Sequence, residues 1–108
     1  MEKFTVGNVV LVSFPFSNLK GEKIRPALVV ALVEFDNLIL CQITSKSYSS
    51  KTAISIEQSD FGEGKLPLKS FVRPDKLFTA DLSILTGRVG KLRSNKGKAI
   101  LQKVRELF

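Results

Sequence analysis

Three residues that could bind a phosphate lie at the two ends of one segment. Arg25 precedes an apolar, β-branched run at 27–33, and Thr44 and Ser45 follow a second run at 38–43. The short turn between the runs contains adjacent Asp and Asn, so the runs are expected to pair as an antiparallel hairpin. That pairing brings the arginine close to the hydroxyls, and a guanidinium and hydroxyls together can hold a phosphate. The plain alternative is a solvated arginine and two residues that end a strand.

A second pair, Arg73 and Asp75, lies in the extended stretch FVRPDK. Residues i and i+2 of a strand point the same way, so these two side chains are expected to project together, about 7 Å apart at the backbone. Pro74 cannot donate to a strand ladder and therefore indicates an edge or a bend. The alternative is an exposed ion pair that contributes little to stability.

The two sets together suit RNA cleavage without a metal ion. Such a reaction needs a base for the ribose 2′-hydroxyl, stabilisation of the extra charge on phosphorus, and an acid for the departing 5′-oxygen. An aspartate, two arginines and nearby hydroxyls supply the first two requirements. DNA lacks the 2′-hydroxyl and would be spared. We expect the Arg25 end of the hairpin and the Arg73–Asp75 segment to face one groove.

Composition excludes several other classes of site. The chain has no His and one Cys, so we expect no metal ion and no cofactor. There is no glycine-rich phosphate-binding loop. The net charge of +7 favours a polyanionic partner, such as nucleic acid, an acidic protein segment or a membrane surface. No apolar run is long enough to span a bilayer and no signal peptide is evident, so a cytoplasmic protein is expected.

The 108 residues are expected to form a single domain, 1–108. Pattern predicts mainly short strands, loops at 15–23 and 57–65, and a C-terminal amphipathic helix with Ser94 as its N-cap. The predicted strands are 7–14, 27–33, 38–43, 52–56, 70–73, 76–79 and 85–92. This order suggests a mainly β fold: an SH3-like partial barrel of short antiparallel strands with one C-terminal helix.

Four blocks in this order resemble the PemK/MazF toxins of type II toxin–antitoxin systems, including the Kid branch. They are GNVVLVSFPFS, KIRPALVV, LCQITSKS and FVRPDKLFTAD. The resemblance covers about Gly7 to Phe108. It implies a homodimeric, sequence-selective, metal-independent endoribonuclease that cleaves single-stranded mRNA and inhibits growth. It also implies a cognate antitoxin, and RNA products with a 2′,3′-cyclic phosphate and a 5′-hydroxyl.

The resemblance places the family's site residues on Arg25, Thr44, Ser45, Arg73 and Asp75. In the Kid branch the aspartate is the base and the arginine the acid. An arginine does not lose its proton at neutral pH, so we assign both arginines to the scissile phosphate and its transition state. The aspartate either accepts the 2′-proton or holds its neighbouring arginine in place.

The loop after the first strand departs from the family pattern. Residues 18–23 contain neither the His nor the Gln found in relatives. Either Lys20 or Lys23 replaces those contacts, or the RNA preference and the rate differ. Lys20, Lys23 and Lys46 are therefore candidate RNA-binding residues, together with the two hydroxyls. The acid that protonates the leaving group stays open between Lys23, a hydroxyl and water.

Two rival functions remain. One is a non-enzymatic toxin that binds DNA gyrase, as the related CcdB proteins do. The other is a plain RNA-binding SH3-like module, which would bind RNA in a salt-sensitive way without turnover.

Overall fold

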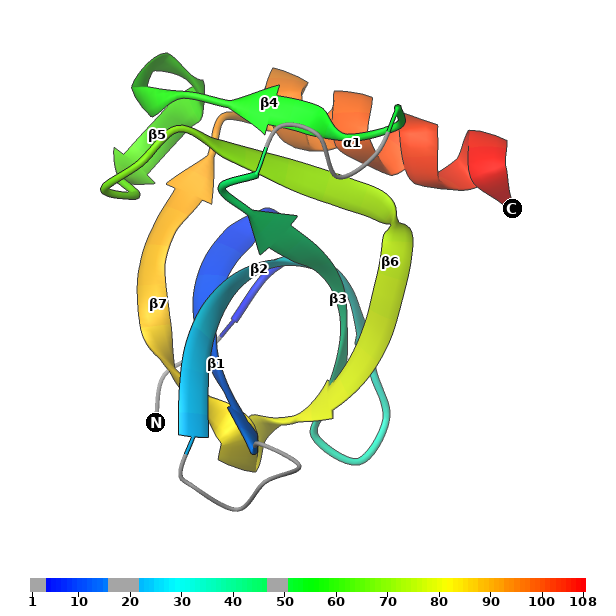
Figure 1. Ribbon diagram of the computed structural model, residues 1–108. Helices are drawn as coiled ribbons and strands as arrows, with labels where there is room; N and C mark the ends of the chain where they lie inside the picture. Colours follow the sequence, from blue (N-terminus) through cyan, green and yellow to red (C-terminus); the bar gives the residue numbers. More distant parts are fainter. Residues whose placement is uncertain (1–3, 16–21, 47–50) are drawn as a thin grey trace.

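The computed structural model describes residues 4–15, 22–46 and 51–108, which fold into one strongly curled antiparallel sheet and a C-terminal helix (Figure 1). The sheet has seven strands in the order β4-β6-β3-β2-β1-β7-β5. The elements are β1 (Asn8–Pro15), β2 (Glu22–Val33), β3 (Asn37–Thr44), β4 (Ile54–Ile56), η2 (Gln58–Asp60), β5 (Phe61–Gly64), β6 (Ser70–Asp81), η3 (Leu82–Ile84), β7 (Leu85–Leu92) and α1 (Ser94–Leu107). The predicted mainly β, barrel-like fold with one terminal helix is confirmed.

The sheet is covered on both faces, because neighbouring residues of its central strands belong to different apolar clusters. Successive side chains of a strand point to opposite faces. The first cluster contains Val9, Leu28, Cys41, Ile43, Ile56, Phe61, Val72, Leu92 and Ile100. The second contains Val10, Val12, Ala27, Val29, Leu38, Leu40 and Ala80. Burial on both faces explains why the first strand is apolar almost without interruption.

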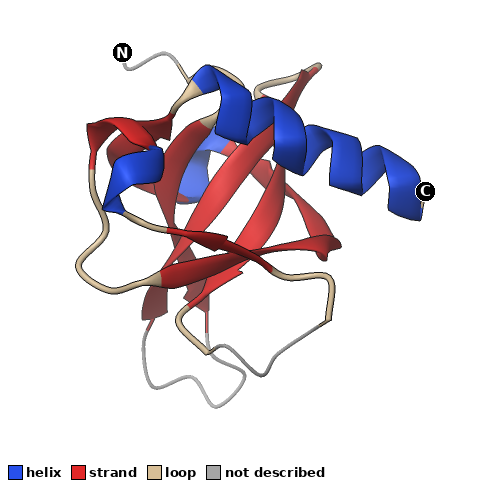
Figure 2. Cartoon of the chain, turned by 90° about the horizontal axis from the view of Figure 1, so that it is seen from above, coloured by secondary structure: helices blue, strands red, loops and turns tan. Residues whose placement is uncertain are grey.

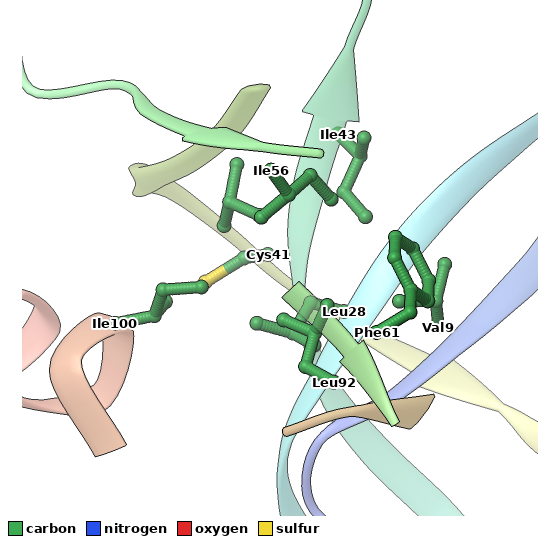
Figure 3. Packing of buried hydrophobic residues seen from close by; sticks show 9 residues of the cluster. Val9, Leu28, Cys41, Ile43, Ile56, Phe61, Leu92 and Ile100 are labelled. Atoms are coloured by element: carbon green, nitrogen blue, oxygen red, sulfur yellow. The ribbon is translucent and has the colours of Figure 1, made fainter. Parts of the chain in front are cut away.

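Helix α1 runs across one end of the curled sheet (Figures 1 and 2) and packs against β6. Its fully buried residue, Ile100, points toward Cys41 in the first cluster (Figure 3). The helix begins one residue earlier than expected. Ser94 is already helical, and the N-cap is Arg93, whose side chain instead donates a hydrogen bond of 2.9 Å to the Ser59 carbonyl.

The predicted hairpin forms between β2 and β3, with Leu28 opposite Cys41 and Val33 opposite Asn37. Strand β2 is longer than predicted, because pairing with β1 continues to Glu22. Glu22 and Lys23 therefore belong to a strand and not to the loop expected at 15–23.

The loop predicted at 57–65 is wrong. This stretch forms the short helix η2 and strand β5, which pairs with β7. Paired glycines, Gly64 on β5 and Gly90 on β7, permit the close approach of the two strands. A Cβ on either one would lie within 3 Å of a backbone carbonyl oxygen of the other strand, that of Val89 or of Glu63. The glycines that suggested a loop are therefore needed for the close approach of two backbones.

The segments at 70–73 and 76–79 are one continuous strand, β6. The predicted irregularity at Pro74 lies in the pairing with β3. Cys41 lies opposite Leu77, and the next residue, Gln42, lies opposite Arg73. Residues 74–76 therefore have no partner on β3 and form a bulge.

Candidate active site

The ends of β2 and β3 meet as the sequence predicts. Lys23, Arg25, Thr44 and Ser45 line one cavity of about 250 Å³, whose apolar wall includes Leu66 and Leu68. The Arg25 guanidinium forms no ion pair or hydrogen bond with any residue that the structure describes. The expected proximity of the arginine to the two hydroxyls is confirmed, and this guanidinium can accept an external anion.

Thr44 already uses one lone pair. Its Oγ1 accepts a hydrogen bond of 3.1 Å from the Lys46 backbone N–H. This turn leaves the Thr44 O–H available as a donor, for example to a phosphate oxygen. The Lys46 and Ser45 side chains are exposed beside it.

Arg73 and Asp75 form a two-pronged ion pair on β6. Nη2 of Arg73 lies 2.7 Å from Oδ2 of Asp75, and Nε lies 3.3 Å from Oδ1. The arginine side chain is 15% exposed and the aspartate side chain 34%. The expectation that they project together is confirmed. The bulge at 74–76 and the partial burial make this pair more constrained than an ordinary surface ion pair.

The two predicted sets share one face of the sheet. Gln42 of β3 lies opposite both Ala27 of β2 and Arg73 of β6, so these three side chains point the same way. Arg25 is two residues from Ala27, and Thr44 is two residues from Gln42, so both point to that face too. Strands β2 and β6 are separated only by β3, about 10 Å at the backbone, which is within reach of two arginine side chains.

Asp75 lines a second cavity. Gln42, Asp75, Lys76, Leu77 and Phe78 line a cavity of about 440 Å³. The cavity of Arg25 is a separate one, lined also by Ile43 of the first cluster and by Leu66, which packs against that cluster. The residues expected to face a single groove therefore lie at two separate cavities.

The Arg73 guanidinium, above all, holds the pKa of Asp75 below its ordinary value of 3.8. The backbone N–H of Asp75, the arginine charge and the Thr52 hydroxyl act in the same direction, and desolvation opposes them. Asp75 is therefore ionised at neutral pH. Its low pKa makes it a weak base, and its charge holds the Arg73 guanidinium in place. Burial, with a smaller effect from the Asp75 charge, raises the pKa of Cys41 to about 12, so its thiol is an unsuitable nucleophile.

A family model for the PemK-like, MazF-like toxin of type II toxin–antitoxin systems matches residues 5–108. The chain belongs to the PemK/MazF toxin family. A search of curated protein sequences gives no match.

Solved structures of PemK/MazF toxins share the fold. A MazE–MazF complex from Deinococcus radiodurans matches at 17% identity with a TM-score of 0.75, covering 94% of this chain and 92% of the other. Mycobacterium tuberculosis toxin MazF-mt6 matches at 17% identity and 0.70, covering 92% and 93%. An endoribonuclease in complex with its cognate antitoxin from a mycobacterial species matches at 18% identity and 0.65, covering 98% and 89%.

Among the lysines predicted for this PemK/MazF chain, Lys23 lies at the cavity of Arg25 and Lys46 follows Thr44. Lys20 lies outside the described residues. Within residues 4–15, 22–46 and 51–108, no three His, Cys, Asp or Glu side chains gather in a group that could hold a metal ion. In the same part of the chain, no helix has the length and apolar character needed to cross a membrane.

Two further residues near Asp75 were not predicted from the sequence. Thr52 shows no motif in the sequence. It lies two residues before β4, which pairs with β6, and its hydroxyl forms a hydrogen bond with the Asp75 carboxylate. Gln42 does give a signal, since it is a polar residue inside the apolar run LCQI. That signal could have marked it as a site residue.

Proposed function

We propose that the chain is an endoribonuclease toxin that cleaves single-stranded mRNA selectively, without a metal ion, and thereby inhibits growth. The observation that carries this proposal is the common face of Arg25, Thr44, Arg73 and Asp75 on three neighbouring strands. Two guanidiniums, a hydroxyl donor and a carboxylate around one surface match the requirements of a phosphate transesterification.

The reaction would use the 2′-hydroxyl of the RNA as nucleophile. Its oxygen attacks phosphorus while Asp75 accepts its proton, and the bond to the 5′-oxygen breaks. Arg25 and Arg73 bind the non-bridging oxygens and neutralise the charge that develops on them. The products are a 2′,3′-cyclic phosphate and a 5′-hydroxyl. The proton for the leaving oxygen comes from the Lys23 side chain, from a hydroxyl such as that of Thr44, or from water.

We further propose a homodimer that a cognate antitoxin neutralises. The family match supports this, as do structural neighbours described as a MazE–MazF complex and as an endoribonuclease with its cognate antitoxin. The net charge of +7 suits both RNA and an acidic antitoxin segment. Light scattering of the purified chain tests the dimer, and inhibition of cleavage by the product of a neighbouring short gene tests the antitoxin.

The decisive experiment incubates the purified chain with mixed-sequence RNA in EDTA. We expect discrete cleavage, products that accept a 5′-phosphate directly from a kinase, and no cleavage of DNA of the same sequence. Arg25→Ala and Arg73→Ala should each lower the rate about 100-fold or more. Arg105→Ala, in the exposed last turn of α1, is the matched control and should cleave normally.

Absence of cleavage at any sequence would overturn the proposal, as would full activity of Arg25→Ala. Gyrase inhibition without RNA cleavage would favour a CcdB-like toxin, and RNA binding without turnover a plain binding module.

A further inference from the structure

Gln42 presents a carboxamide on the face of the sheet that Ala27 and Arg73 share. It lies on β3 between Ala27 and Arg73, with its side chain half-buried. The carboxamide forms no hydrogen bond with any residue that the structure describes. An amide offers two N–H donors and one carbonyl acceptor. A half-buried amide without partners is therefore available for a ligand.

The cavity of about 440 Å³ beside this amide has the properties of a nucleobase site. Leu77 and Phe78 supply apolar wall, and Gln42 supplies donors and an acceptor. Lys76, also at the cavity, is exposed and adds a positive charge. A nucleobase has apolar faces and a polar edge, and unpaired bases of single-stranded RNA are recognised through contacts to both.

We propose that Gln42 is a specificity-determining residue that reads the edge of a nucleobase seated in this cavity. The inference rests on the proposed function. Asp75 lines the same cavity and, in that function, accepts the proton of the 2′-hydroxyl. The base in the cavity then belongs to the nucleotide that carries this hydroxyl, immediately 5′ of the cleaved bond. A side-chain amide can form two hydrogen bonds with one base edge, which distinguishes that base from others.

The test compares cleavage-site profiles on a randomised RNA pool, obtained by sequencing the product ends. Wild type should show a base preference at the position 5′ of the cleaved bond. Gln42→Leu keeps the approximate size of the side chain and removes its hydrogen bonds, so the preference at this position should fall at least about fivefold. Preferences at other positions should stay. Gln102→Leu, at an exposed site on α1, is the matched control and should keep the wild-type profile.

The outcomes separate the two proposals. No cleavage by wild type refutes the proposed function. Cleavage by wild type with no base preference at this position, or with the same preference in Gln42→Leu, overturns the inference alone. If Gln42→Leu does not fold, Gln42→Glu decides, because its carboxylate accepts but does not donate. The inference then requires a different preferred base, and an unchanged profile overturns it.

Discussion

Arg73 holds Asp75 through two hydrogen bonds, 2.7 Å from Nη2 to Oδ2 and 3.3 Å from Nε to Oδ1. Asp75 lies within the bulge at 74–76, two residues from Arg73 on the same strand. The pair fixes the guanidinium on the face that it shares with Arg25, and keeps the carboxylate ionised. Each partner thus determines how the other can act on RNA.

Asp75→Asn should lower kcat about 100- to 10,000-fold if the carboxylate accepts the 2′-proton. The amide is nearly the same size, and the folded state should persist in a thermal scan. Binding of an uncleavable 2′-deoxy substrate should change much less than kcat. A loss confined to binding would instead assign Asp75 to holding Arg73.

Asp81→Asn is the matched control for that variant. Asp81 also lies on β6, and its pKa is also lowered, in this case by hydrogen bonding with Ser83. It lies at the opposite end of the strand from Arg73. Normal cleavage by Asp81→Asn would show that loss of a β6 carboxylate does not by itself reduce activity.

The rate of cleavage should vary little between about pH 5 and 8, because the chain has no His, the residue that ordinarily titrates there. The pKa of Asp75 is below 3.8 in the folded protein, so its carboxylate stays ionised across the whole window. The stability that this lowered pKa contributes is present above the unfolded-state value and is lost as the pH falls through the folded value. Cleavage rate constants measured across this pH range, in buffers of constant ionic strength, test the expected flat profile. A limb inside the window would reveal another titrating catalytic group.

Much of the fold follows from apolar runs and turn residues, whereas the site depends on pairings between distant segments. The β2–β3 hairpin is visible in two β-branched runs. The common face of Arg25 and Arg73 is not, because it depends on the strand order and on the length of the bulge. Strand β5 was missed because its glycines look like a loop in sequence, although Gly64 permits close pairing with β7.

Phe35→Asn should stabilise the protein by about 1 kcal/mol. The left-handed residues of the β2–β3 turn are Phe35, at φ 61°, and Asp36, at φ 60°. A bulky residue pays about 1–2 kcal/mol in that conformation, which Asn tolerates better. Phe35 is 87% exposed, so the substitution removes little packing. Urea denaturation measures the change, and Phe108→Asn, at an 80% exposed phenylalanine outside the turn, should leave stability unaltered. A less stable Phe35→Asn would contradict the argument.

Thr52→Val should raise the pKa of Asp75, because the Thr52 hydroxyl is one of the groups that lower it. Valine keeps the shape of threonine and removes the hydroxyl, while Thr52→Ser keeps the donor. The remaining hydrogen bonds from Arg73 should still hold the pKa below its ordinary range, so any acid limb of kcat moves upward by less than the full shift.

The pH dependence of kcat in Thr52→Val, Thr52→Ser and wild type measures this. We expect serine to retain the wild-type profile and valine to move the limb to higher pH. A contribution of Thr52 to folding alone would lower the unfolding midpoint of Thr52→Val without moving the limb. Such a result would show that the hydroxyl of Thr52 does not act through Asp75.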